Sequence, residues 1–113
     1  MSRITSHVLD TALGHPARHL AVRIDRLDAG GAWTTLGQAF TDDDGRVRHF
    51  HGAADLPGGT YRVTFDTAAY FEPARRPVFF PQVYVVFRVD DVEDHVHIPL
   101  LLSPFGYSTY RGT

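Results

Sequence analysis

Hydrophobic and polar residues alternate along much of the chain, a pattern typical of β-strands with one buried face. The alternation is strict in residues 60–66, where Tyr61, Val63 and Phe65 share one face and polar residues occupy the other. The same alternation, or a run of β-branched and aromatic residues, predicts further strands at 6–9, 20–25, 33–40, 47–50, 83–89, 96–102 and 106–110. The pattern therefore predicts an all-β protein.

Turn-forming residues separate these strands. They cluster at residues 28–31, 42–45, 56–59 and 90–91. The dipeptide Asp44-Gly45 favours a tight turn, so a hairpin is predicted between Phe40 and Val47.

One short helix interrupts the strands. It is predicted over residues 67–71, because Asp66 can cap its first turn and Pro73 stops it. The strands otherwise recur about every 10 to 15 residues, which is the spacing of a β-sandwich and not of βαβ units. With 113 residues, the chain is expected to form one domain, residues 1–113.

The strand near the C-terminus has two distinct faces. One face is apolar and belongs to the core: Val96, Ile98, Leu100 and Leu102. The other face carries two imidazoles among apolar side chains: His95, His97, Pro99 and Leu101. This second face is too apolar for an ordinary solvent face, so we expect another subunit or a ligand to cover it.

Composition narrows the class of protein. The formal net charge is −2 and the eleven basic residues, all Arg, are scattered, so nucleic acid is not an expected partner. Cysteine is absent, which excludes disulfides and thiolate chemistry. No apolar run approaches the roughly 20 residues that span a bilayer, and no secretory signal precedes His7. A cytoplasmic protein without a membrane partner is expected.

The pair His95 and His97 is compatible with three interpretations. The two residues lie on one face of a strand, about 7 Å apart along it. They can supply two metal ligands, with a third from His7, His49 or His51. One of them can instead activate water as a general base. The two histidines can also be structural, half-buried at an interface where their ring nitrogens have hydrogen-bond partners. Spacing alone leaves these interpretations open.

The acidic run Asp42-Asp43-Asp44 lacks the ligand spacing and distal Glu of an EF-hand loop, so a turn is predicted there and not a calcium site. Arg46 follows this turn. Its guanidinium can bind a carbonyl oxygen or an anionic ring, although the sequence alone favours a solvated arginine.

Several segments together resemble the 5-hydroxyisourate hydrolases of the transthyretin-like protein family. The segment Ser6-His7-Val8-Leu9-Asp10 resembles their N-terminal signature, and Asp44-Gly45-Arg46 resembles their Asp-Gly-Arg turn. Residues 95–104, with the His-x-His pair, are similar to their penultimate strand. The end Tyr110-Arg111-Gly112-Thr113 resembles their Tyr-Arg-Gly-Ser terminus, with Thr in place of Ser.

This resemblance covers residues 4–113 and implies a fold, an assembly and a reaction. The implied fold is an eight-stranded transthyretin-like β-sandwich with one short helix, assembled as a homotetramer, a dimer of dimers. The implied reaction opens the ring of 5-hydroxyisourate at its N1–C6 amide, giving 2-oxo-4-hydroxy-4-carboxy-5-ureidoimidazoline in urate degradation. No cofactor and no metal are expected.

The resemblance also implies a set of site residues. Those assigned to catalysis are His7, Arg46, His97 and Thr113. Those assigned to substrate binding are His7, Arg46, Tyr110, Arg111 and Gly112. His97 is the first choice for the general base, with His7 as the alternative, and His95 is expected to be a neighbour of the site. Two other functions remain open: a non-catalytic transthyretin-like carrier, and a metal-dependent hydrolase that uses His95 and His97 as ligands.

Overall fold

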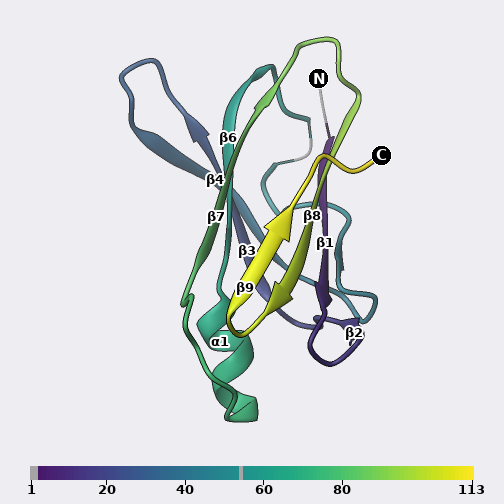
Figure 1. The fold of residues 1–113 in the computed structure, drawn as a ribbon. Helices are drawn as coiled ribbons and strands as arrows, with labels where there is room; N and C mark the ends of the chain where they lie inside the picture. Colours follow the sequence, from purple (N-terminus) through teal and green to yellow (C-terminus); the bar gives the residue numbers. More distant parts are fainter. Residues whose placement is uncertain (1–2, 54) are drawn as a thin grey trace.

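The computed structural model describes residues 3–53 and 55–113, and most of them lie in strands (Figure 1). Within these residues there are nine strand segments: β1 Arg3–Asp10, β2 His15–Pro16, β3 Ala21–Leu27, β4 Trp33–Phe40, β5 Arg46–Val47, β6 Gly59–Phe65, β7 Val83–Val89, β8 His95–Ser103 and β9 Gly106–Thr109. Between β6 and β7 lie the α-helix α1, Thr67–Phe71, and the 3-10 helix η1, Glu72–Ala74. The predicted all-β class is confirmed.

The strands form two sheets that face each other (Figure 1). One sheet has the order β2-β1-β8-β9, with β5 also paired with β1, and the other has the order β4-β3-β6-β7. The pairing of β1 with β8 is parallel, and it places Arg3 opposite His95 and Asp10 opposite Leu102. The first and the penultimate long strand of the chain are therefore neighbours, although they are far apart in the sequence.

The core lies between the two sheets and is built from alternate residues of the strands. In β8 the predicted inward face is confirmed, because Val96, Ile98, Leu100 and Leu102 are all buried. Each such side chain stabilises the fold by about 1.5–3 kcal/mol relative to an exposed position. The opposite face of β8 holds His95, which is exposed, and His97, which is half-buried.

The turn before β5 differs from the prediction. A hairpin between Phe40 and Val47 is wrong, because β4 belongs to one sheet while β5 pairs with β1 in the other. The turn itself is tight, since Asp42 Oδ1 accepts hydrogen bonds from the backbone N–H groups of Asp44 and Arg46, each at 2.9 Å. The chain thus crosses between the sheets and presents Arg46 to β1.

The strand predicted over residues 47–50 is also shorter than expected. Only Arg46–Val47 pairs as a strand, and the chain beyond it forms isolated bridges from Phe50 to Ala53 and from His51 to Gln38. His15–Pro16 adds a short segment that the pattern did not predict.

The helix α1 has the predicted bounds. Asp66 caps it, and its side chain accepts a hydrogen bond from the N–H of Ala69 at 3.2 Å. The α-helix ends before Pro73 as predicted, but the chain continues through that residue as one 3-10 turn and then adopts a left-handed conformation at Arg75. Neither helix in the described part of the chain is long and apolar enough to cross a membrane.

A buried ion pair connects Arg76, just after η1, to Asp10 at the end of β1. The carboxylate of Asp10 is 1% exposed and accepts two hydrogen bonds from Arg76, at 2.6 and 3.1 Å, and one from the hydroxyl of Tyr70 at 2.8 Å. Burial acts to raise the pKa of Asp10, but the hydrogen bonds from Arg76 and Tyr70 hold it below its usual value. The pair therefore joins β1, in one sheet, to the chain that follows β6 of the other.

Candidate active site

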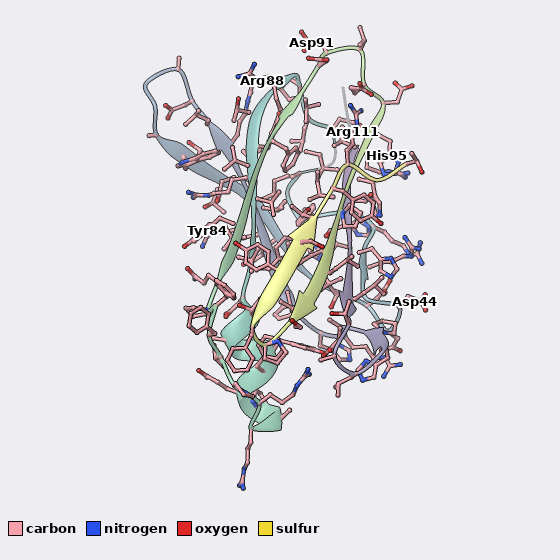
Figure 2. All side chains as sticks on the ribbon, in the orientation of Figure 1. Asp44, Tyr84, Arg88, Asp91, His95 and Arg111 are labelled. Atoms are coloured by element: carbon pink, nitrogen blue, oxygen red, sulfur yellow. The ribbon has the colours of Figure 1, made fainter. Side chains whose placement is uncertain are left out.

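The outer face of β1 and β8 gathers polar side chains from both ends of the chain. Because side chains alternate along a strand, His95 and His97 project from the same face of β8. The parallel register places Arg3 of β1 beside His95 and Thr5 beside His97. Figure 2 shows His95 on the side of the molecule where the C-terminal segment ends, and Tyr84 on the opposite side. The pairing of two sequence-distant strands therefore builds this surface.

The turn before β5 adds an arginine to this surface. β5 pairs with β1 so that Arg46 lies opposite His7. This arrangement depends on Gly45, which has a φ of 77° and whose carbonyl accepts a hydrogen bond from Val8 at 2.8 Å. A Cβ at position 45 would lie 2.4 Å from the carbonyl oxygen of Val8. Glycine thus lets the turn approach β1 closely enough to deliver Arg46.

The C-terminal residues close the other side of the surface. The N–H of Gly112 donates a hydrogen bond to the carbonyl of His97 at 2.9 Å, which forms an isolated bridge. A Cβ at position 112 would lie 2.5 Å from Cδ2 of His97 and 3.0 Å from Cγ of Pro99. Only glycine lets the chain pass so close to the imidazole, and Thr113 follows at the rim.

These elements enclose a cavity of about 200 Å³. Its lining residues come from β1, from β5 with the residue after it, from β8, and from residues 110–113, which we call the tail. They are Arg3, Thr5, Ser6, Arg46, Val47, Arg48, His95, His97 and Thr113. Among these described lining residues there are three arginines and no Asp or Glu. Arg48 also faces carboxylates, those of Asp42 at 3.5 Å and Asp44 at 3.6 Å. The cavity is therefore suited to an anionic or electron-rich ligand.

Two short hydrogen bonds hold the histidine pair. The hydroxyl of Thr5 lies 2.6 Å from Nε2 of His95 and 2.7 Å from Nδ1 of His97. Within the described residues no hydrogen bond involves Nε2 of His97. That nitrogen is thus available to a ligand or a water molecule in the cavity.

The environment of His97 favours its neutral form. Burial lowers the pKa of the His97 imidazole below its usual value of 6.5, and the positive charge of Arg46 lowers it further, followed by His95 and His7. A neutral imidazole with one free nitrogen is a competent general base near neutral pH.

His7 lies beside this cavity without lining it. Its Nε2 is 2.8 Å from the carbonyl oxygen of Asp44. A carbonyl can only accept a hydrogen bond, so Nε2 carries the hydrogen and Nδ1 of the neutral ring is left as an acceptor. His7 therefore presents a lone pair, and its ring is held by the same turn that delivers Arg46.

Tyr110 and Arg111 lie elsewhere. Both line a separate hollow of about 140 Å³ together with Val85 and Phe87 of β7. The guanidinium of Arg111 forms an ion pair with Glu93 at 3.0 Å. Of the residues expected from the sequence, the cavity is thus lined by Arg46, His97 and Thr113, whereas Tyr110 and Arg111 line the separate hollow.

The arrangement of the histidines bears on the metal interpretation. Nε2 of His95 and Nδ1 of His97 both point at the hydroxyl of Thr5 and not at an open position. His49 and His51 pack against each other in a neighbouring hollow, with ring centroids 6.2 Å apart. In residues 3–53 and 55–113, no group of three or more His, Cys, Asp or Glu side chains is arranged to hold a metal ion.

Five of the nine lining residues were not named as site residues from the sequence: Arg3, Thr5, Ser6, Val47 and Arg48. Thr5 shares a face with His7 by alternation, which was visible in the sequence. Its contact with His97 depends on the parallel pairing of β1 with β8, which the local pattern does not encode.

Comparison with known proteins agrees with this geometry. Residues 4–112 match the model of the HIUase/Transthyretin family. The chain is 43% identical over 117 residues to a 5-hydroxyisourate hydrolase of Caulobacter vibrioides, covering 100% of both chains. The structure of Klebsiella pneumoniae 5-hydroxyisourate hydrolase superimposes with a TM-score of 0.86, at 39% identity and 100% coverage of both chains. The structure of sea bream transthyretin in complex with thyroxine superimposes with a TM-score of 0.89, at 31% identity, covering 98% of this chain and 95% of that one.

Proposed function

The chain belongs to the HIUase/Transthyretin family, and on that premise we propose that it hydrolyses 5-hydroxyisourate in the cavity beside His97. The product is 2-oxo-4-hydroxy-4-carboxy-5-ureidoimidazoline, formed by water attack at C6 and cleavage of the N1–C6 amide. The observation that carries the proposal concerns His97, which lines a cavity that also contains arginines. Its surroundings favour the neutral imidazole, and its Nε2 makes no hydrogen bond within the described residues. Relatives named as 5-hydroxyisourate hydrolases support the choice of substrate.

His97 acts as the general base. Its Nε2 takes a proton from the attacking water as the oxygen–carbon bond forms at C6. The same nitrogen then returns the proton to the departing N1. Because His97 is predominantly neutral at neutral pH, no prior deprotonation is needed.

Arg46 stabilises the oxyanion that develops on the C6 carbonyl oxygen. A guanidinium stays charged at neutral pH and offers a rigid set of donors. Such preorganised donors typically contribute about 10²–10³ in rate. His7 lies beside the lining residues, and we propose that the substrate or the attacking water reaches its Nδ1 at the edge of the cavity. The Thr113 hydroxyl donates a hydrogen bond at the rim. Gly112, Arg111 and Tyr110 hold the tail in place.

The test is an ultraviolet absorbance assay with freshly prepared 5-hydroxyisourate, from which spontaneous decay is subtracted. We expect a large acceleration that survives exhaustive chelation. Tight binding without acceleration would identify a carrier in the manner of transthyretin and overturn the proposal. Loss of activity on chelation, with recovery on adding a metal, would identify a metal-dependent hydrolase.

We also propose that four copies assemble as a dimer of dimers that covers the outer face of β8. The support is the apolar character of that face and the exposure of two large apolar side chains in turns of the same sheet, Leu13 between β1 and β2 at 55% and Phe105 between β8 and β9 at 68%. Sedimentation should give four times the 12.6 kDa mass of one chain. A monomer at micromolar concentration would contradict this assembly.

We propose further that residues 1–113 act as one domain in the cytoplasm. The support is the length of the chain and its lack of cysteine, which suits a reducing compartment. Cell fractionation with an antibody to the chain tests the location, and recovery of the chain in a membrane or secreted fraction would contradict it.

A further inference from the structure

Thr5 connects the two histidines through a single hydroxyl. Its oxygen lies 2.6 Å from Nε2 of His95 and 2.7 Å from Nδ1 of His97, and the two rings are 6.1 Å apart between centroids. Thr5 is 8% exposed, so water does not compete freely for these bonds. The hydroxyl has one hydrogen and can donate only one of the two bonds. At least one of the two ring nitrogens must therefore carry a hydrogen.

Two neutral arrangements, with one hydrogen on each ring, place the Thr5 hydrogen in one of these two bonds. In the first, Nδ1 of His97 donates to Thr5 and Thr5 donates to Nε2 of His95, so Nε2 of His97 has a free lone pair. In the second, every hydrogen bond runs the other way, and Nε2 of His97 carries the hydrogen. Of these two, only the first makes His97 a base toward the cavity. The two differ by a proton shift from His97 to Thr5 and one from Thr5 to His95, together with a proton gained at Nε2 of His97 and one lost from Nδ1 of His95.

We propose that Thr5 is a positioning residue that sets the tautomer of His97 and relays a proton between His97 and His95. The inference rests on the proposed hydrolysis and deepens it. When Nε2 of His97 takes the water proton, Nδ1 passes its own proton to Thr5 Oγ1 while the Thr5 hydroxyl passes its proton to Nε2 of His95. The steps are proton transfers only. They reverse when Nε2 of His97 protonates the leaving nitrogen.

The charges around the two rings favour this direction of transfer. Positive charge at His97 is disfavoured by burial and by Arg46 and His7. His95 is exposed, so water hydrates a charge there. The charged and titratable groups on the elements packed around the pair are Arg3 and His7 on β1, Arg46 and Arg48 at β5, Asp94 directly before His95, and Arg111 beside Gly112, whose charge is paired with Glu93. Arg3 opposes a charge on His95 but is itself exposed, so solvent weakens that repulsion.

Thr5→Val and Thr5→Ser form a matched pair for the test. Valine has nearly the same shape but no hydroxyl, whereas serine keeps the hydroxyl. Loss of a group that fixes an imidazole tautomer typically lowers activity about 10- to 100-fold. We expect Thr5→Val to lower kcat by that factor with KM unchanged, and Thr5→Ser to restore it. A kcat of Thr5→Val equal to that of the parent, in a variant with the parent's melting temperature, would overturn the proposal.

A double-mutant cycle tests the relay separately from the tautomer. His95→Gln should lower kcat in the parent chain but have little further effect in Thr5→Val, because the path is already broken. Equal effects of His95→Gln in both backgrounds would overturn the relay.

Nitrogen-15 NMR of the imidazoles gives a readout that does not need the reaction. At neutral pH the parent should show His97 protonated at Nδ1, and Thr5→Val should lose that preference. His97 protonated at Nε2 in the parent would overturn the proposal. If the parent failed to accelerate hydrolysis, the proposed function would be wrong, while the NMR result would still decide the role of Thr5.

Discussion

The imidazole of His97 shows how neighbours convert an ordinary side chain into a usable base. One nitrogen is held by Thr5, and the other faces a cavity lined by arginines. Nothing in the local sequence distinguishes His97 from His95, since both lie on one face of one strand. The difference comes first from burial, since His97 is half-buried and His95 is exposed, and then from β5, which places Arg46 where its charge acts on His97.

Replacing His97 with Asn should remove the base while leaving the strand intact. We expect kcat to fall by about 10²–10⁴, the usual contribution of a positioned acid or base. The absorbance assay measures the loss, and sedimentation shows whether the assembly is unchanged. Near-normal turnover by His97→Asn would transfer the role of base to His7.

The pH profile should report the same residue. Burial and then Arg46 lower the pKa of His97, so the acid limb of kcat/KM should lie below pH 6.5. Activity is then present above that limb and is lost as the pH falls through it. Arg46→Ala removes a positive charge, so the pKa should rise and the limb should move to higher pH, together with a lower maximum rate. A limb that stays in place in Arg46→Ala would separate Arg46 from the titration of His97.

At the scale of elements, the strands were largely predictable and their partners were not. Residues 33–40, 67–71 and 83–89 have the bounds that the sequence pattern predicted, because alternation and capping are local properties. The turn at residues 42–46 was predicted as a turn, but its hairpin was wrong, because the sheet that a strand joins is decided by contacts far away in the sequence. The residues of the candidate site also come from strands that are far apart in the sequence, so they were predicted from family resemblance and not from the local pattern.

The close contact between the tail and His97 leads to a prediction at the scale of elements. Gly112→Ala places a Cβ within 2.5 Å of the His97 ring, so the ring or the tail must move. We expect a marked loss of kcat with little loss of stability. Gly106→Ala is the matched control, since its Cβ would meet nothing closer than the Ser103 hydroxyl at 3.8 Å. Equal activity in the two variants would show that the tail does not position His97.

At the scale of the whole molecule, the pair between Asp10 and Arg76 connects two parts of the sandwich that share no strand pairing. The side chain of Asp10 is fully buried and that of Arg76 is 16% exposed, so the two charges depend on each other. Arg76 and Asp10 lie 66 residues apart in the chain, so no local sequence pattern reveals that they form a pair.

Arg76→Ala should leave the Asp10 carboxylate buried without its cation, and this typically destabilises a protein by about 3–5 kcal/mol. Thermal or urea unfolding measures the change. Arg75→Ala, at the exposed neighbour, serves as the control and should have a small effect.

The same pair predicts how stability depends on pH. The pKa of Asp10 is held below its usual value of 3.8, so its contribution to stability is present above that pH and is lost as the pH falls through the lower, folded-state value. Asp10→Asn should flatten this acid dependence. An unchanged acid dependence in Asp10→Asn would show that other carboxylates govern acid unfolding.

The parallel pairing of β1 with β8 has a consequence for how the protein is made. The hydroxyl of Thr5 and the ring of His97 are 92 positions apart in the chain, so a nascent polypeptide cannot assemble the cavity while its later residues are still inside the ribosome. Contacts of such long range also slow folding, into the range of about milliseconds to seconds for β-sandwiches. Catalytic turnover would therefore appear only after β8 has left the ribosome and paired with β1, which makes it a sensitive reporter of this long-range folding step.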